Sequence, residues 1–200
     1  DPALTERGTQ EVAALCQELD GQSFDAFYVS PLRRARQTAE PLARRLGMKA
    51  QVCDWLAELA HPDFDGHPWE DVEAAFLAAQ TRPPGQWWDG MPGGESFRDF
   101  QHRVVTGLEA LLAAEHGATT RDVDGYRMWD TPDRQLSLRL VCHGGTSGVV
   151  LSHLLDLEVV PWVYERFPLR TGGSAVLETR ELSSGEIWML TSFEGSARLY

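Results

Sequence analysis

The sequence predicts an α/β fold, a three-layer sandwich in which helices flank a mainly parallel central sheet. Two short apolar runs, residues 25–30 (DAFYVS) and 138–142 (LRLVC), lack the polar and apolar alternation of a half-exposed strand, which is typical of parallel strands buried on both faces. Each run leads directly into a helical pattern, and a β-hairpin pattern ends the chain. This alternation of strand and helix predicts helices on both faces of one sheet.

The first fifty residues predict two helices around the first strand. Thr5 is suited to cap a helix whose apolar residues recur at helical spacing until Asp20. After the strand, Ser30 and Pro31 predict the N-cap and the first residue of a second helix, because serine caps well and proline fits the first turn. Pro41 predicts that this second helix is kinked or divided, since proline cannot donate a backbone hydrogen bond there.

The middle of the chain predicts a strand, a loop and two further helices. Residues 52–56 predict a second strand, and apolar spacing predicts a short helix over 69–79. The segment 81–95 contains four glycines and three prolines, a composition that predicts a loop without regular structure. Ser96 is placed to cap a long helix that runs to about His116.

The last part of the chain predicts a long loop, another strand with its helix, and a hairpin. Residues 117–137 are polar and irregular, and a loop of this length is typical of a lid, an insertion or a disordered segment. The strand at 138–142 is followed by a helix over about 146–155. Two strand patterns, 174–180 and 186–193, predict the closing hairpin.

Composition indicates one globular domain over residues 1–200. With 42% hydrophobic side chains, the chain can bury a core without disulfides or a structural metal. Cys16, Cys53 and Cys142 are far apart and form no CxxC pair, which argues against a disulfide framework and a structural zinc site. No stretch is apolar enough for a membrane span, and no secretory signal pattern is present. We therefore expect a cytoplasmic protein without a membrane partner, with a homodimer as an open alternative.

The charge of the chain argues against nucleic acid as a partner. The 30 acidic residues against 18 basic ones give a formal net charge of −12, and no basic run interrupts this excess. Binding of a polyanion depends on clustered Lys and Arg side chains that neutralise its phosphates. We therefore do not expect nucleic acid as a partner.

The two junctions from strand to helix, YVSPLRRA and LVCHGGTSG, form the candidate functional site. Ligands of parallel sheets bind beyond the carboxyl ends of the strands, where a helix N-terminus offers unpaired N–H groups to an anion. The first junction carries three arginines, Arg33, Arg34 and Arg36. Cations at a helix start are unfavourable unless an anion lies nearby, so either one or two of these arginines face a ligand or all three are solvated. At the second junction, His143 is either a site residue or a core histidine in a tight turn.

The junction residues resemble a known signature. The segment 30–40 (SPLRRARQTAE) is similar to the one that follows the second strand in the histidine phosphatase superfamily, the clan of phosphoglycerate mutase-like enzymes. Four further segments resemble motifs of that family in the same order: DPALTERG (1–8), LAE (56–58), GES (94–96) and VCHGG (141–145). Together they extend over nearly the whole chain, so the resemblance implies a phosphoglycerate mutase-like fold.

The resemblance implies phosphoryl transfer from a small phosphate ester through a phosphohistidine intermediate, without a metal or other cofactor. Arg34 matches the phosphate-clamping arginine of the family, whose planar fork suits two phosphoryl oxygens. His143 matches the second histidine, which holds another phosphoryl oxygen, and N–H groups near Gly144 would add to this charge stabilisation. Glu58 matches the acid that protonates the leaving oxygen and then takes a proton from the hydrolytic water.

One motif of the family is missing from these residues. The family's nucleophile is the histidine of an Arg-His-Gly segment on the first strand, just before the motif that residues 1–8 match, and the sequence contains no RHG. Loss of a strand from inside a sheet would leave unpaired backbone groups. We therefore expect an R-H-G strand upstream of Asp1, and a non-catalytic binding module for phosphorylated ligands is the alternative.

Two other hydrolase classes are alternatives to the histidine phosphatases. The loop at 61–67 alternates four side chains that could ligate a divalent ion: His61, Asp63, Asp65 and His67. The HGG segment at 143–145 is similar to an esterase oxyanion hole. An esterase of that class also requires a G-x-S-x-G nucleophile turn, and residues 145–148 have the wrong spacing for one.

Within the family, the sequence favours a phosphatase over a mutase. The mutases carry an inserted stretch with Lys and Arg between the acid and the long helix, where it holds the substrate carboxylate. The corresponding interval, from Glu58 to Glu95, has Arg82 as its only base. Trp87 and Trp88 of this interval either cap a bulky substrate or pack on the domain. We therefore expect hydrolysis of small phosphorylated metabolites, with mutase-type phosphotransfer as the alternative.

Overall fold

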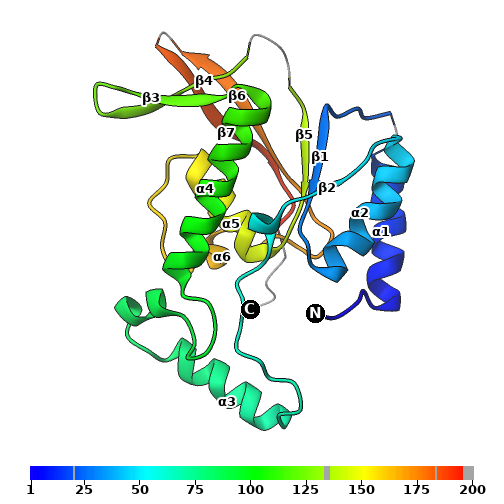
Figure 1. The fold of residues 1–200 in the computed structure, drawn as a ribbon, viewed down its shortest axis with the longest axis vertical. Coiled ribbons are helices and arrows are strands. Elements are labelled where there is room, and N and C mark those ends of the chain that lie inside the picture. The colour runs from blue at the N-terminus through cyan, green and yellow to red at the C-terminus, as the bar shows by residue number, and fades with distance from the viewer. Residues whose placement is uncertain (20, 133–135, 183, 196–200) are drawn as a thin grey trace.

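The computed structural model of the protein describes residues 1–19, 21–132, 136–182 and 184–195. Its strands form a parallel sheet of order β2-β1-β5 and an antiparallel sheet of order β3-β4-β7-β6 (Figure 1). The strands are β1 (Ala26–Val29), β2 (Gln51–Val52), β3 (Thr119–Val123), β4 (Tyr126–Asp130), β5 (Leu138–Val141), β6 (Ala175–Leu182) and β7 (Gly185–Phe193). The helices are α1 (Glu6–Glu18), α2 (Arg33–Leu46), α3 (Trp69–Gln80), α4 (Phe97–His116), α5 (Gly144–Leu154) and α6 (Val163–Arg166), with 3-10 turns η1 (Asp54–Leu56) and η2 (Pro84–Asp89).

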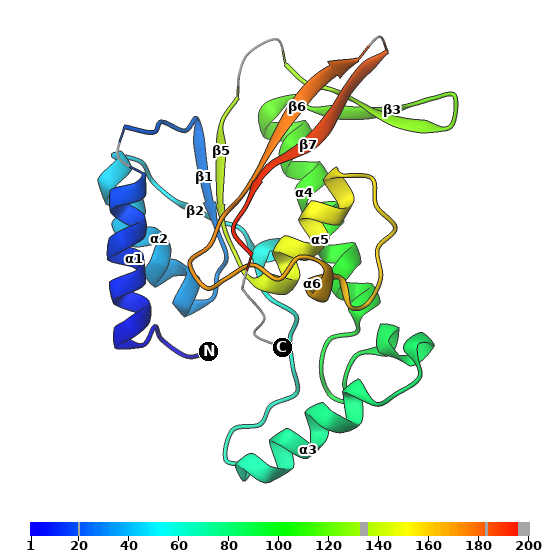
Figure 2. The same cartoon turned by 180° about the vertical axis from the view of Figure 1, so that it is seen from behind.

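The parallel sheet has helices on both faces, which confirms the predicted fold class. Phe27 and Val29 of β1 pack with α1 and α2 on one face, while Tyr28 packs on the other face beside Leu111 of α4. Figure 2 shows α1 and α2 on one side of β1 and β5, and α4 and α5 on the other side. Burial on both faces explains why β1 shows no alternation of polar and apolar residues.

The pairing of β1 with β5 positions the two predicted junctions. These strands pair in parallel from Ala26 opposite Leu138 to Val29 opposite Val141. Because parallel strands have their carboxyl ends at the same edge of a sheet, the residues that follow β1 and β5 lie side by side. The helices α2 and α5 both begin at this edge.

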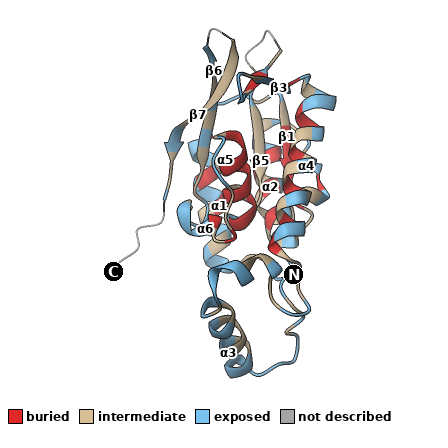
Figure 3. Cartoon of the chain, turned by 90° about the vertical axis from the view of Figure 1, so that its left-hand side faces the viewer, coloured by how far each residue is buried: buried red, intermediate tan, exposed pale blue. Residues whose placement is uncertain are grey.

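Several predicted helices are confirmed, together with two of their caps. The Thr5 hydroxyl accepts a hydrogen bond from the Gly8 N–H at 3.1 Å, and the Ser96 hydroxyl accepts one from the Asp99 N–H at 3.1 Å. The helix α3 lies where it was predicted, but none of its residues is buried, and Figure 3 shows it apart from the buried core. None of the described helices is long and apolar enough to cross a bilayer.

The start of α2 differs from the prediction. This helix begins at Arg33 with Leu32 as its N-cap, and no side chain caps it, so Ser30 is not the capping residue. Pro41 does not divide α2, which runs without interruption to Leu46. The packing of four buried side chains against the sheet holds the helix on both sides of this proline: Ala35, Ala39, Leu42 and Ala43.

The predicted strand over 52–56 is wrong beyond its first residue. After β2 ends at Val52, the Cys53 N–H donates to the Val29 carbonyl and the chain turns into η1. Trp55 of η1 packs against Gly107 of α4, where an added Cβ would lie 2.2 Å from Trp55 Cγ. The contact of Trp55 with α4 therefore replaces further strand pairing.

The predicted loop over 117–137 is wrong for most of its described residues. The strands β3 and β4 form a hairpin that turns at Asp124 and Gly125, with φ angles of 55° and 85°. Asp-Gly is a preferred pair for two-residue hairpin turns, because both positions need positive φ. Through Trp129 opposite Glu186, this hairpin joins the β6–β7 hairpin, whose prediction is confirmed. Residues 133–135 of the predicted loop lie outside the described residues.

The loop predicted over 81–95 contains one short 3-10 helix, η2.

Gly107→Ala should destabilise the protein by about 2 kcal/mol, because the new Cβ overlaps the Trp55 ring and forces it to move. Urea unfolding monitored by tryptophan fluorescence gives this value. Gly8→Ala in α1 is the matched control, since its Cβ would meet the flexible Leu4 side chain at 3.3 Å and the Thr5 Oγ1 at an ordinary contact distance of 3.5 Å. Equal stability of the Gly107→Ala protein and the wild type would contradict the close packing of η1 on α4.

Candidate active site

The residues that follow β1 and β5 meet through one side-chain hydrogen bond. Ser30, directly after β1, lies with its Oγ 2.7 Å from Nε2 of His143, the N-cap residue of α5. Ser30 is completely buried, and His143 is partly buried. His143 therefore lies at the carboxyl edge of the sheet and is not fully enclosed in the core.

The surroundings of His143 favour its neutral form. Burial lowers the pKa of this imidazole, and the positive charge of Arg34 lowers it further, so that the pKa falls from 6.5 to about 4. Close to neutral pH the ring is therefore uncharged and carries one N–H group. A neutral imidazole of this kind can donate one hydrogen bond to an anion without itself bringing a positive charge.

Glu58 lies against the N-terminus of α5. Its carboxylate accepts hydrogen bonds from the N–H groups of Gly145 at 2.8 Å, Thr146 at 3.2 Å and Leu59 at 2.9 Å. Gly145 allows this approach, because an added Cβ would lie 2.5 Å from the Glu58 carboxylate. The helix start thus fixes both oxygens of the predicted acid close to His143.

Gly144 keeps an unused donor at the same helix start. Its N–H group has no hydrogen-bond partner among the described residues, whereas the next two N–H groups are bound to Glu58. An added Cβ at Gly144 would meet nothing within 4 Å, so the surroundings of this residue are open. The arrangement leaves this N–H group available to an anion.

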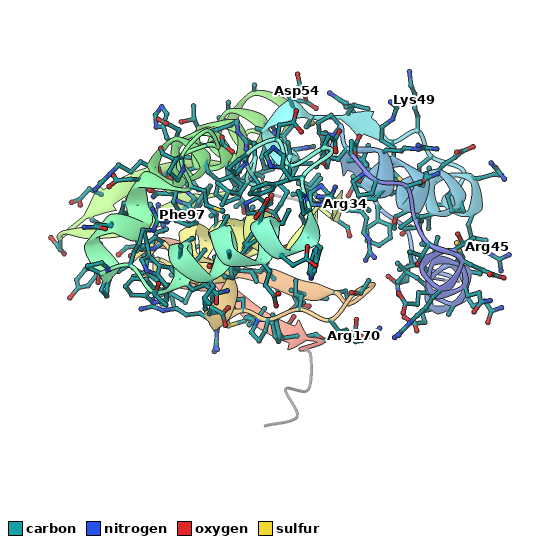
Figure 4. All side chains as sticks on the ribbon, turned by 90° about the horizontal axis from the view of Figure 1, so that it is seen from below. Arg34, Arg45, Lys49, Asp54, Phe97 and Arg170 are labelled. Atoms are coloured by element: carbon teal, nitrogen blue, oxygen red, sulfur yellow. The ribbon has the colours of Figure 1, made fainter. Side chains whose placement is uncertain are left out.

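Arg34 is the arginine of the first junction that lies toward His143. It shifts the pKa of His143, and its only ion pair in the described chain is a 3.7 Å contact with the Asp1 carboxylate. Figure 4 shows Arg34 near the centre of the view from below, whereas Arg45 and Lys49 lie toward the periphery. The Arg34 side chain is a third exposed, which leaves it accessible to an anionic ligand.

Arg33 and Arg36 lie on a different surface of α2. Both are exposed and line a cavity of about 620 Å³ between α2 and residues 48–52. Of the three arginines, Arg34 therefore lies toward the strand ends. Helical spacing allowed one or two of them to do so.

A charged cluster behind Glu58 holds its loop to α4. The Arg103 guanidinium binds both carboxylate oxygens of Glu95, at 2.9 and 2.8 Å, and donates to the carbonyls of Trp55 and Ala57. The backbone of Glu95 is also tied to this loop, since its N–H donates to the Ala60 carbonyl at 2.7 Å. These contacts tie the loop that presents Glu58 to α4, and the Thr146 hydroxyl of α5 donates to the same Ala57 carbonyl at 3.0 Å.

The loop at 61–67 does not gather its four polar side chains. His61 packs edge-on against Phe76, and His67 packs edge-on against Phe64. In the described part of the chain, no three His, Cys, Asp or Glu side chains are grouped as metal ligands. The alternative of a metal-dependent hydrolase built on this loop thus finds no support.

The two tryptophans of the 81–95 segment pack on the protein. Trp88 stacks edge-on against Phe97 of the core, and Trp87 packs against Trp162 and donates its indole N–H to the Arg82 carbonyl. Arg82 in turn donates to the Gly90 carbonyl. Of the two alternatives for these tryptophans, the structure therefore shows the packing role.

Sequence reasoning missed Ser30 and Arg103 as parts of the site. Ser30 was assigned to the cap of α2, and its partner His143 lies 113 residues away, beyond any local pattern. Arg103 lies within an amphipathic helix and carries no signal of its own. The GES motif was the available clue, because its glutamate is the residue that Arg103 binds.

A model of the histidine phosphatase superfamily (branch 1) matches residues 1–184, so the chain belongs to this family. It is 36% identical over 165 residues to a bifunctional protein of Mycobacterium tuberculosis, a match that covers 78% of this chain and 42% of that protein. It is 31% identical over 138 residues to a 2,3-bisphosphoglycerate-dependent phosphoglycerate mutase of Azorhizobium caulinodans, with 60% of this chain and 67% of the mutase covered. The chain therefore spans less than half the length of the mycobacterial relative.

The solved structure of a phosphatase has the same fold as this chain. The chain superposes with a TM-score of 0.69 and 27% identity on a mycobacterial glucosyl-3-phosphoglycerate phosphatase in complex with VO3, covering 98% of this chain and 88% of that one. The named relatives of this chain thus include both a phosphatase and a mutase.

Arg103→Met should destabilise the protein by about 2 kcal/mol, because it leaves the partly buried Glu95 carboxylate without its charged donors. Thermal or urea unfolding provides the measurement. Arg44→Met is the matched control, since the Arg44–Glu40 pair is exposed and should contribute below about 1 kcal/mol. Equal losses in the two variants would show that Arg103 does not fix the Glu58 loop.

Acid should destabilise the protein through His143. Between pH 6.5 and about 4, the unfolded chain binds a proton on this imidazole and the folded protein does not, so protonation favours unfolding. The free energy of unfolding should therefore fall by about 2 kcal/mol more in the wild type than in His143→Gln across this range, after allowance for partial exposure. Parallel curves for the two proteins in pH-dependent urea unfolding would rule out a depressed pKa.

Proposed function

We propose that this chain belongs to a phosphomonoester hydrolase that acts on small phosphorylated metabolites through a phosphohistidine intermediate, without a metal. The observation that carries the proposal is the grouping of four complementary features at one edge of the sheet. A neutral His143, the Arg34 guanidinium and the unpaired Gly144 N–H suit a phosphoryl anion, and Glu58 lies beside them. Membership of the histidine phosphatase superfamily supports the same assignment.

The proposed reaction has two displacements at phosphorus. A histidine nitrogen forms a bond to phosphorus as the ester P–O bond breaks, and the leaving oxygen takes the proton of the Glu58 carboxyl group. Water then attacks phosphorus, its proton passes to the Glu58 carboxylate, and the N–P bond breaks to release inorganic phosphate. Arg34, His143 and the Gly144 N–H stabilise the charge on the phosphoryl oxygens in both steps.

We propose that the nucleophilic histidine belongs to an R-H-G strand outside these 200 residues. Two unpaired strand edges support this proposal. Within the described residues, β5 pairs only with β1, and β7 pairs with β6 along its length but with β4 at a single position. A strand between β5 and β7 would join the two sheets, satisfy both edges and place its carboxyl end near His143.

A phosphoglycerate mutase-type phosphotransferase is the second candidate, and its support is the relative from Azorhizobium caulinodans. Phosphatase activity is favoured by the interval between Glu58 and Glu95. Its only base, Arg82, donates to the carbonyls of Ala79 and Gly90 and so is engaged with the backbone. A substrate carboxylate therefore has no free cation to bind in this segment.

Hydrolysis of an aryl phosphate by the full-length protein should survive EDTA, and Arg34→Ala should lower kcat/KM by roughly 10²-fold. That loss corresponds to about 3 kcal/mol for a charge-assisted bidentate contact with the phosphoryl group. Arg36→Ala, an exposed arginine of the same helix, should leave the rate unchanged. Loss of activity on chelation that a divalent ion restores would overturn the metal-free mechanism.

Glu58→Gln should slow formation of the phosphoenzyme by roughly 10²-fold or more from alkyl phosphates, and much less from nitrophenyl phosphate. Alkoxides need a full proton to leave, whereas nitrophenolate needs little protonation. Single-turnover labelling of the full-length protein isolates this step from the later hydrolysis, in which Glu58 also acts. Glu70→Gln, an exposed glutamate of α3, is the control. Equal losses for both substrate types would show that Glu58 is not the acid, and Asp63 and Asp65 of the same loop would then be tested.

A further inference from the structure

Ser30 is completely buried, yet its side chain does not act as the cap of α2. Its Oγ accepts a hydrogen bond from the Leu32 N–H at 3.3 Å and lies 2.7 Å from Nε2 of His143. A hydroxyl that already accepts one hydrogen bond still has its own proton to donate. The short contact with His143 therefore allows Ser30 to act as the donor.

The imidazole of His143 has one proton to place on two nitrogens. Burial and the nearby Arg34 charge keep this ring neutral, so one nitrogen donates and the other accepts. Among the described residues, Nε2 has Ser30 as its partner and Nδ1 has no hydrogen-bond partner. Nδ1 is therefore the nitrogen that is left for a ligand.

The position of this proton decides what His143 offers to a phosphoryl group. With the proton on Nδ1, the ring donates a hydrogen bond to a phosphoryl oxygen. With the proton on Nε2, the ring donates to Ser30 and turns a lone pair toward the anion, which repels it. The partner of one ring nitrogen sets the protonation of the other.

We propose that Ser30 is a positioning residue that donates its hydroxyl proton to Nε2 of His143 and so fixes the Nδ1–H tautomer. The effect of this hydrogen bond on the reaction rate rests on the proposed phosphoryl transfer. The assignment of the tautomer is independent of that proposed function. In this arrangement the buried hydroxyl replaces solvent as the partner of Nε2. The imidazole is then ready to donate from Nδ1 before any substrate arrives.

The tautomer is measured directly by long-range ¹H–¹⁵N correlation spectra of the ¹⁵N-labelled full-length protein at neutral pH. The signal of His143 is assigned by its loss in His143→Gln. We expect the pattern of an Nδ1–H imidazole in the wild type and a shift toward the Nε2–H pattern in Ser30→Ala. An Nε2–H pattern in the wild type would overturn the proposal without reference to any variant.

Ser152→Ala is the matched control, since Ser152 is also completely buried and its hydroxyl has no partner in the described chain. This variant should keep the wild-type tautomer of His143. An unchanged His143 pattern in a folded Ser30→Ala protein would contradict the role of Ser30, as would an equal change in Ser152→Ala.

Kinetics separate this inference from the proposed function. Ser30→Ala should lower kcat/KM for an aryl phosphate by about 10-fold and weaken inhibition by inorganic phosphate, while Ser152→Ala should do neither. A wild-type protein that hydrolyses no phosphate ester but shows the Nδ1–H pattern would refute the proposed function and leave the tautomer assignment intact. Full activity of Ser30→Ala would refute a catalytic effect of the serine.

Discussion

The binding of the Glu58 carboxylate by the N–H groups of Gly145 and Thr146, in the first turn of α5, is the interaction on which the arrangement of the site depends. It connects the loop after η1 to the helix that follows His143, and the charge of Glu58 complements the positive end of that helix. Gly145 makes the contact possible, because any larger residue would displace the carboxylate. One short contact thus brings the predicted acid and the helix start that is proposed to bind phosphate together.

Two further constraints keep this contact in place. On one side, Arg103 and Glu95 bind the loop to α4, and Trp55 packs into the space that Gly107 leaves. On the other side, parallel pairing sets the ends of β1 and β5 next to each other, so that Ser30 reaches His143. The candidate site is therefore supported by regular elements, while the groups proposed to bind the ligand lie at the ends of these elements.

Local sequence patterns were sufficient to predict the two strand-to-helix junctions and most of the helices. The strand-to-helix sequences around Ser30 and His143 predicted an anion site at the edge of the sheet, because burial and helix starts are encoded within a few residues. The caps at Thr5 and Ser96 followed from the same kind of local preference. The turn at Asp124-Gly125 was also available in the sequence, and its hairpin could have been predicted.

Other features depend on contacts between distant residues, which a local pattern does not contain. Ser30 has the sequence context of an N-cap, but tertiary structure gives its hydroxyl to His143. Residues 54–56 have the composition of a strand, but the burial of Trp55 on α4 turns them into a helical turn. In both cases a tertiary contact overrides a local propensity.

The central claim is that these residues support phosphoryl transfer through a histidine, and rapid-quench trapping tests it most directly. The full-length protein is mixed with a ³²P-labelled phosphate ester and quenched within one turnover. Covalent label on the protein that is stable in alkali and lost in acid, as expected of phosphohistidine, is the predicted result. Complete hydrolysis of the ester with no labelled protein at any time, or a label that is stable in acid and lost in alkali, would contradict the claim.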